Sequence, residues 1–347
     1  MSEIRVALVG VGNSASALIQ GTQYYKNAAE GTDVPGLMHV MFGPYHINNI
    51  KFVAAFEVNK DKIGKDLSQA IFTAPNCCAK FAEVPNLGVK VSGGPVIDGV
   101  AEHMRKIFNV YEHEVEPEHV VEVLKKTKAD ILVNYLPVGS HKAARFYAQA
   151  ALDAGCAFIN CMPEFIASDA TWSKKFEDKK LPIAGDDIKS QLGATILHRN
   201  IARLCVDRGV LIDETYQLNL GGDTDFLNMT VEERLKTKRI SKTEAVTSMV
   251  PYELPTRIGP SDYVPFLENK KICYLWLKGR KFGDRPLTIS VKLEVEDSPN
   301  SAGVVIDLIR ALKIALDRKI GGALLSVSSY AFKHPPIQVP DSLAKQA

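Results

Sequence analysis

Short apolar runs alternate with longer amphipathic stretches over roughly the first two hundred residues of the chain. The apolar runs, which are typical of buried parallel strands, cover residues 4–9, 51–57, 129–137, 155–160 and 181–184. Helical periodicity is found over residues 60–71, 96–108, 117–127, 141–154, 167–179 and 194–206. This alternation predicts an α/β unit with a doubly wound parallel sheet of Rossmann type.

The pattern changes after residue 206. Residues 210–221, 271–278 and 286–296 have the composition of strands, and in the last of these Leu287, Ile289 and Val291 alternate with polar residues. Long strands without intervening helices predict an inserted α+β domain whose sheet is mostly antiparallel and suited to subunit contacts. The amphipathic segment 300–317 then returns to the first domain. We therefore expect a dinucleotide-binding domain at 1–204 plus 300–347, and an inserted domain at 205–299.

Polar residues gather at the turn that follows the fifth predicted strand. Asp186, Asp187, Lys189 and Ser190 lie between residues 181–184 and the helix that begins at 194. Ligands of open α/β sheets bind at this carboxyl edge. A helix cap explains one Asp or the Ser, but not two carboxylates, an ammonium and a hydroxyl together. We expect a functional turn here, with Asp186 on the cofactor side.

A glycine-rich turn follows the first strand. Gly10 and Gly12 permit a tight turn, and Asn13 and Ser14 open the helix whose N-terminus would face a pyrophosphate. The third glycine of the usual pattern is replaced by Ala15. A plain strand–turn–helix is the alternative.

Further cofactor contacts are expected at the ends of later strands. Glu57 is the candidate partner of the ribose hydroxyls, and its charge favours NAD over NADP. Asn134 and Ser140 would lie on the nicotinamide side, although Ser140 could simply cap a helix. Residues 32–49, an insertion without clear periodicity, are expected to form a long loop near the nucleotide.

Composition narrows the class of protein. The chain has 347 residues, of which 46% are hydrophobic and 24% charged, with a net charge of +2. These values give no reason to expect nucleic acid or a membrane as a partner. The six cysteines form no C-x-x-C pair, as expected of reduced thiols in a cytoplasmic protein. The first strand begins at Ile4, which leaves no room for a signal peptide.

Two lysines have the spacing of neighbours on a helix. Lys238 and Lys242 are four residues apart, so their like charges repel unless an anion lies between them. A solvated basic face is the alternative.

Motifs along nearly the whole chain resemble those of the myo-inositol-1-phosphate synthase family, in its shorter bacterial and archaeal form. The motifs are Gly-Val-Gly-Asn at 10–13, Asn-Tyr-Leu-Pro at 134–137, Gly-Asp-Asp-Ile-Lys-Ser at 185–190, Leu-Gly-Gly-Asp at 220–223, Ser-Lys at 241–242 and Glu-Asp-Ser-Pro-Asn-Ser-Ala-Gly at 296–303. The resemblance implies NAD-dependent conversion of D-glucose 6-phosphate to 1D-myo-inositol 3-phosphate by a homotetramer.

The resemblance also implies roles for particular residues. The residues that match the family's active-site lysines are Lys238, Lys242, Lys333 and either Lys270 or Lys271. Its carboxylates match Asp187 and Asp297, and its phosphate-contacting turn matches Lys189 and Ser190. Asp297 is also a candidate ligand for a cation, which some relatives use. The chain has Gly-Asp-Thr-Asp at 222–225 where longer members have Gly-Asn-Asn-Asp, so roles are not carried over there.

Two other functions fit the sequence. One is an NAD-dependent dehydrogenase that oxidises a phosphorylated polyol, which would accumulate NADH. The other is a non-catalytic NAD-binding protein, which would need neither Lys333 nor the Asp186–Asp187 pair.

Overall fold

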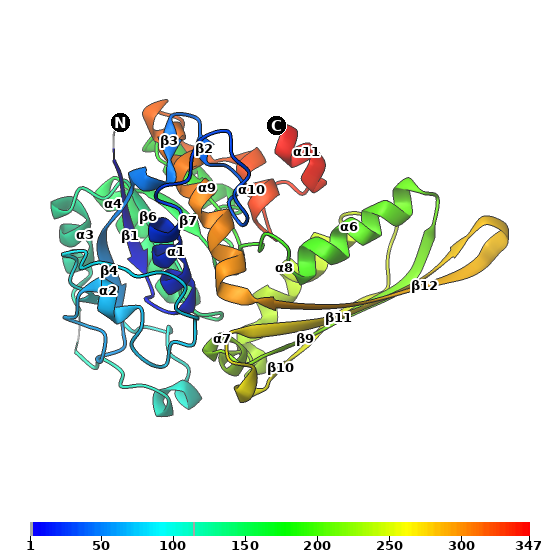
Figure 1. The fold of residues 1–347 in the computed structure, drawn as a ribbon, viewed down its shortest axis with the longest axis horizontal. Helices are drawn as coiled ribbons and strands as arrows, with labels where there is room; N and C mark the ends of the chain where they lie inside the picture. The colour runs from blue at the N-terminus through cyan, green and yellow to red at the C-terminus, as the bar shows by residue number, and fades with distance from the viewer. Residues whose placement is uncertain (1–2, 114) are drawn as a thin grey trace.

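A computed structural model describes residues 3–113 and 115–347, which form two units (Figure 1). The larger unit contains a seven-stranded sheet in the order β13-β8-β7-β6-β1-β4-β5. Its strands, all paired in parallel, are β1 (Ile4–Val9), β4 (Ile50–Glu57), β5 (Ser92–Gly93), β6 (Ile131–Asn134), β7 (Ala157–Asn160), β8 (Pro182–Ala184) and β13 (Gly322–Ala323). The predicted Rossmann-type sheet is confirmed.

Helices cover both faces of this sheet. One face packs against α1 (Asn13–Tyr24) and α9 (Asp297–Asp317), and the other against α3 (Pro117–Lys126), α4 (His141–Ala154) and α5 (Ala170–Asp178). Along β1, Val6 and Leu8 point into the first layer while Ala7 and Val9 point into the second. Burial on both faces explains why the strands are continuous apolar runs.

The smaller unit is a four-stranded sheet that extends away from the first like an arm (Figure 1). Its order is β10 (Thr256–Tyr263), β9 (Leu211–Gly221), β11 (Lys270–Lys281) and β12 (Arg285–Glu296). The β9–β11 and β11–β12 pairs are antiparallel, as expected, whereas β10 is parallel to β9. Strand β10 was not predicted, because its Gly, Pro and Asp residues hide the strand pattern.

The shorter elements surround these two sheets. They are β2 (Met41–Phe42), β3 (Tyr45–His46), α2 (Leu67–Ala70), α7 (Thr224–Asn228), α8 (Lys236–Thr247), α10 (Leu325–Ala331) and α11 (Asp341–Gln346). Within the described residues, no helix is both long and apolar enough to cross a bilayer.

Helix α6 (Ala194–Asp207) lies along the second sheet rather than the first. Ala202 and Cys205 on this helix share an apolar cluster with Ile212 of β9 and Leu277 of β11. The arm therefore begins with α6, earlier than the boundary expected after residue 204. At its other end, α9 packs beside α1 and returns the chain to the first unit, as predicted.

Two predicted helices are wrong. Residues 60–66 form turns, with Gly64 at φ +84°, before the short helix α2 that Asp66 caps. Residues 96–101 also lack helix, and a 3-10 helix then spans Glu102–Lys106. Gly99 interrupts the helical pattern there, and the segment lines a cavity instead of packing as a helix on the sheet.

None of residues 32–49 lines the cavity, although Gly36 O accepts a hydrogen bond from Gln191 Nε2 in the turn beside it (2.9 Å). The insertion packs on α9, where the buried Arg310 donates from Nη1 to Val40 O (2.7 Å) and from Nη2 to His39 O (2.7 Å). Arg310 also pairs with Asp307, which contacts His39 as well. One buried guanidinium therefore satisfies carbonyl groups of the insertion that would otherwise lack partners.

We expect Arg310→Ala to lower the free energy of unfolding by about 3–5 kcal/mol, because it strands Asp307 and two carbonyls in the interior. Urea denaturation measures this change. Arg318→Ala, an exposed arginine at the end of the same helix, is the matched control and should leave the midpoint nearly unchanged. Equal midpoints for both variants would contradict the anchoring role of Arg310.

Candidate active site

A cavity of about 300 Å³ lies between the two units. The carboxyl ends of the parallel strands form one wall, and β9, α7, α8 and the start of α6 form the other. Charged and polar side chains from both units therefore meet in one enclosed space, as expected for a ligand site at the carboxyl edge of an open sheet.

The glycine-rich turn lines this cavity. Gly10 has φ +86°, and a Cβ there would lie 2.9 Å from the Tyr135 carbonyl oxygen. A Cβ at Gly12 would meet nothing within 4 Å, so the cavity side of the turn is open. Within the described chain, no side chain caps the N-terminus of α1. The turn therefore offers free N–H groups, with Asn13 and Ser14, to a pyrophosphate.

Glu57 lies on the same wall and also holds the turn in place. Its Oε2 accepts a hydrogen bond from Val11 N (2.8 Å), and its Oε1 accepts one from Val58 N (2.7 Å). The Lys62 ammonium donates to Val11 O (2.6 Å). Lys62 was not predicted, because a lysine in a turn region carries no recognisable spacing signal.

Two of the other predicted cofactor residues, Asn134 and Ser140, support the wall rather than form it. Asn134 is fully buried, donates to Asn160 Oδ1 (2.9 Å) and accepts from Leu136 N (3.1 Å). Ser140 donates to Pro137 O (2.7 Å). Asn13 is on the wall, but its Oδ1 also accepts from Cys77 N (2.9 Å).

Asp186 is buried away from the cavity wall. Its carboxylate accepts hydrogen bonds from Asn160 Nδ2 (2.7 Å) and from the N–H groups of Ile166 (3.0 Å), Ala167 (3.1 Å) and Ser168 (3.0 Å). Burial raises the pKa of Asp186 to about 6, although these donors oppose the rise. Asp186 therefore fixes the loop at 166–168. This arrangement does not favour a direct contact between Asp186 and a cofactor.

Asp187 organises the lysines. Its Oδ1 accepts from Lys238 Nζ (2.8 Å) and Lys333 Nζ (2.9 Å), and its Oδ2 accepts from Ser241 Oγ. Burial alone would raise the pKa of Asp187, but the two ammonium groups outweigh it and hold the pKa well below its usual range. Asp187 thus stays ionised and aims Lys238 and Lys333 at the cavity, whose wall both side chains join.

Lys271, not Lys270, belongs to this cluster. Lys271 Nζ lies 3.2 Å from both oxygens of Asp297, and both residues line the cavity. Lys270, its neighbour on β11, is exposed and pairs across the sheet with Glu296. Successive side chains along a strand point to opposite faces of the sheet. Lys271 therefore faces the cavity and Lys270 does not, a distinction that the sequence alone left open.

Lys242 differs from the other lysines of the wall. It is buried, and among the described residues it has no hydrogen-bond or ion-pair partner within range. Burial, together with repulsion from Lys238, Lys271 and Lys333, lowers the pKa of Lys242 to about 7. Lys242 can therefore exist as a neutral amine or an ammonium near neutral pH.

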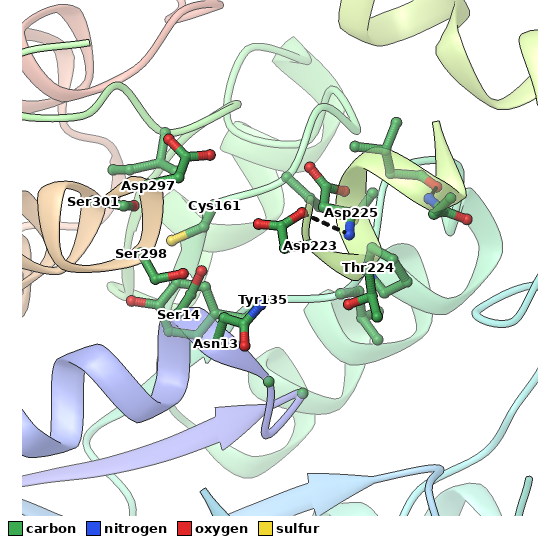
Figure 2. Close-up of a pocket in the computed structure, with 18 of the residues that line it drawn as sticks. Asn13, Ser14, Tyr135, Cys161, Asp223, Thr224, Asp225, Asp297, Ser298 and Ser301 are labelled. Atoms are coloured by element: carbon green, nitrogen blue, oxygen red, sulfur yellow. Dashed lines mark hydrogen bonds between the residues drawn. The ribbon is translucent and has the colours of Figure 1, made fainter. Parts of the chain in front are cut away.

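Carboxylates also line the cavity. Figure 2 shows Asp297, Ser298 and Ser301 from the start of α9, and Asp223 and Asp225 from the start of α7. Burial and the charges of Asp225 and Asp297 raise the pKa of Asp223 to about 7. Asp223 and Asp225 lie in the stretch 222–225, to which no role was carried over from the resemblance.

Lys189 and Ser190 are separated by the structure. Ser190 lines the cavity beside the uncapped start of α6, whereas Lys189 points away and binds Asp341 Oδ1 (2.7 Å) and Ser329 O (2.8 Å). Of these two residues, Ser190 is therefore the one that can reach a ligand in the cavity, and Lys189 fastens the turn to the C-terminal segment.

A cation at Asp297 finds no support. Its carboxylate is paired with Lys271. In residues 3–113 and 115–347, no group of three or more His, Cys, Asp and Glu side chains is arranged to hold a metal ion.

Comparisons with known proteins agree with one another. A family model described as Myo-inositol-1-phosphate synthase matches residues 193–298. The inositol-3-phosphate synthase of Mycolicibacterium smegmatis is 55% identical over 99% of this chain and 96% of its own length. That of Corynebacterium glutamicum is 54% identical over 99% and 97%.

Solved structures have the same fold. The crystal structure of Ari2 is 32% identical, with a TM-score of 0.80 over 99% of this chain and 100% of that one. A myo-inositol-1-phosphate synthase-related protein from Thermotoga maritima is 23% identical, with a TM-score of 0.82 over 99% and 96%, and supports the fold alone. Identity above half over nearly the full length shows that the chain belongs to the inositol-3-phosphate synthase family.

Proposed function

We propose that the protein converts D-glucose 6-phosphate to 1D-myo-inositol 3-phosphate, with NAD as a redox cofactor that is regenerated in each cycle. The observation that carries this proposal is the union of a dinucleotide turn with four lysines, Lys238, Lys242, Lys271 and Lys333, on the wall of one cavity. A reaction that develops negative oxygen at several stages on a phosphorylated substrate needs such a set.

The residues present fit NAD. The open glycine turn and the N-terminus of α1 would hold the pyrophosphate, and Glu57 would accept hydrogen bonds from the ribose. When bound, NAD would take hydride from C5 of the substrate while the proton of the 5-hydroxyl leaves to solvent, and both would return in the later reduction.

The substrate phosphate fits the start of α6. Gly193, Ala194 and Thr195 line the cavity there, and Ser190 lies beside Gly193. In the described structure the helix has no side-chain cap, so its first N–H groups and the positive end of its dipole are available to an anion.

The paired lysines supply fixed positive charge. Burial lowers the pKa of Lys238, but the charges of Asp187, Asp225 and Asp297 raise it by more. The pKa of Lys238 therefore lies above its usual value. Burial lowers the pKa of Lys333 to about 8, and the charge of Asp187 opposes this change. With Lys271, these ammonium groups would stabilise the oxyanion at C5 and the enolate that forms when C6 loses a proton.

Lys242 is suited to move the proton. As a neutral amine among ammonium groups it can accept the C6 proton, and the enolate carbon then attacks the C1 aldehyde and closes the ring. The proton on Lys242 and the neighbouring charges would stabilise the alkoxide that results. Reduction at C5 completes a cycle with no net change in redox state.

We also propose a homotetramer that uses the sheet of the second unit. Tyr216 and Tyr274 are 37% and 41% exposed, and they lie on adjacent strands of that sheet. Such a surface is typical of subunit contacts.

Incubation with glucose 6-phosphate and NAD tests the proposed function. An inositol phosphate should appear while absorbance of NADH stays at baseline. Stoichiometric NADH would favour a polyol phosphate dehydrogenase, and the absence of any product would refute catalysis on this substrate.

We predict that Lys242→Met lowers kcat by about 10²–10³ while NAD binding is unchanged, because the group that would accept the C6 proton and stabilise the alkoxide is lost. Single-turnover kinetics and NAD titration measure the two quantities. Lys236→Met is the control, since Lys236 is exposed at the start of the same helix. Full activity of the Lys242 variant would remove the lysine cluster from the mechanism.

The pH profile gives a separate prediction. Because the pKa of Lys242 is lowered to about 7, the amine is protonated below that pH and free to accept a proton above it. We expect kcat to rise about tenfold per pH unit up to roughly 7 and then level off. Lys242→Arg should abolish this limb, whereas Asp223→Asn should leave it in place. A limb that persists in Lys242→Arg assigns the titration to another group.

Cofactor choice should depend on the charge of Glu57. We expect NAD to be strongly preferred over NADP, and Glu57→Gln to narrow the ratio of the two kcat/KM values by about tenfold, because a carboxylate repels a 2′-phosphate. Glutamine retains one oxygen for Val11 N, but its NH2 group would then face the N–H groups of Val58 and Asn59, so the NAD affinity of the variant is measured beside the ratio. Equal use of NADP by the unmutated protein would refute this role of Glu57.

A further inference from the structure

Two cations are buried on either side of the place that the proposed function assigns to the substrate phosphate. Lys189 is 1% exposed and Arg199 is 0% exposed. Lys189 directly precedes Ser190 in the turn of the first unit, and Arg199 lies in the second turn of α6. They therefore flank residues 190–195, the phosphate cradle of the proposed function. Neither of these two side chains is on the cavity wall, so their burial needs another explanation.

One carboxylate of the C-terminal segment binds both cations. Asp341 Oδ1 accepts a hydrogen bond from Lys189 Nζ (2.7 Å), and Asp341 Oδ2 lies 3.3 Å from Arg199 Nε. The same Oδ2 accepts from Asn200 Nδ2 (3.1 Å). Asp341 is the first residue of α11, which packs beside α10 (Figure 1). One side chain of α11 therefore joins a turn of the first unit to the first helix of the arm.

The residues just before this carboxylate strengthen the attachment. Arg199 Nη2 donates to Val339 O (2.7 Å). Gln338 Nε2 donates to Lys333 O (2.6 Å). The segment 338–341 thus contacts α6, the turn before α6 and the backbone of Lys333, all of which carry groups of the cavity wall.

The charges at this junction do not cancel, because two cations face one carboxylate. Burial and repulsion from Arg199 lower the pKa of Lys189 to about 7, and Asp341 opposes the shift. Loss of Asp341 would leave two like charges in a dry interior, which favours movement of one of them toward water. Since Lys189 and Arg199 adjoin the two ends of the phosphate cradle, such a movement would separate Ser190 from the first N–H groups of α6.

Stability alone does not account for this arrangement. Buried ion pairs are often no more stabilising than apolar side chains of similar volume. They do fix direction, because charge-assisted hydrogen bonds have a specific geometry. A bound phosphate needs such precision, since groups that hold a ligand must keep their positions within about 0.5 Å. The cradle is also tightly packed, because a Cβ at Gly193 would lie 3.0 Å from Ser190 Cβ.

We propose that Asp341 is a positioning residue, which binds Lys189 and Arg199 together and thereby sets the position of Ser190 relative to the start of α6. The inference rests on the proposed function, because that function assigns the substrate phosphate to this place. Asp341 is not on the cavity wall, so it would act only through the two cations.

Inorganic phosphate is the probe that tests this role, because it can occupy the cradle without reacting. We expect Asp341→Ala to raise the inhibition constant of phosphate against glucose 6-phosphate by about tenfold, since the charge-assisted contacts to the anion loosen. The KM for glucose 6-phosphate should rise by a similar factor. NAD affinity should be unchanged, because NAD would be held by the glycine turn at 10–13. Steady-state kinetics and NAD titration measure these quantities.

Three further variants separate positioning from a structural role. Asp341→Asn removes the negative charge but retains the shape of the side chain, and should raise the inhibition constant even if Asp341→Ala fails to fold. Asp341→Glu retains a carboxylate and should recover part of the loss. Ala344→Gly weakens α11 at a position that is buried in the same helix. It should lower the thermal midpoint while the inhibition constant of phosphate stays the same.

A double-mutant cycle with Lys189→Met identifies the route. Lys189→Met and Asp341→Asn should each raise the inhibition constant of phosphate, and the double variant should be no weaker in binding than either alone, because both changes break one link. Additive effects, or an unchanged inhibition constant in Asp341→Asn, would overturn the inference. An unmutated protein that forms no inositol phosphate from glucose 6-phosphate would instead refute the proposed function itself.

Discussion

The active cavity depends on one buried carboxylate, that of Asp187. It is 0% exposed, which is unfavourable for an ion unless partners replace water. Lys238 comes from the arm, Lys333 from the segment after α10, and Ser241 from the next turn of α8. The backbone of Asp187 has φ +62°. Its N–H donates to Met162 O, and its carbonyl accepts from Lys333 N. The two units are therefore joined at a point where each satisfies the other's charge, and loss of Asp187 would leave two ammonium groups in a dry site.

Pairing divides the lysines by function. Asp187 and Asp297 keep Lys238, Lys333 and Lys271 in place, so their charges are present before the substrate binds and need no reorganisation during the reaction. Lys242 lies among them without such a partner in the described structure, and its pKa falls into the range where a proton can be exchanged. In the proposed mechanism, one cluster would thus provide both fixed electrostatic stabilisation and a proton carrier.

Much of the fold could be predicted from the sequence, and the predictions that were wrong have physical causes. Continuous apolar runs identified the parallel strands, and strict alternation identified β12, because both patterns follow from burial. The contacts of Asp187 could not be predicted, since its partners lie 51 and 146 residues away. Asn134, Asp186 and Lys189 matched motifs, yet each supports the site from behind its wall, and side-chain direction at a turn is set by tertiary contacts.

The central claim is that oxidation and reduction occur at the same carbon within one catalytic cycle. Glucose 6-phosphate that carries deuterium at C5, incubated with unlabelled NAD, tests it most directly by mass spectrometry and NMR of the product. Our account predicts an inositol phosphate that retains the deuterium at the carbon derived from C5, with no NADH accumulated. Loss of the label to NADH or solvent, with an oxidised sugar phosphate as product, would contradict it.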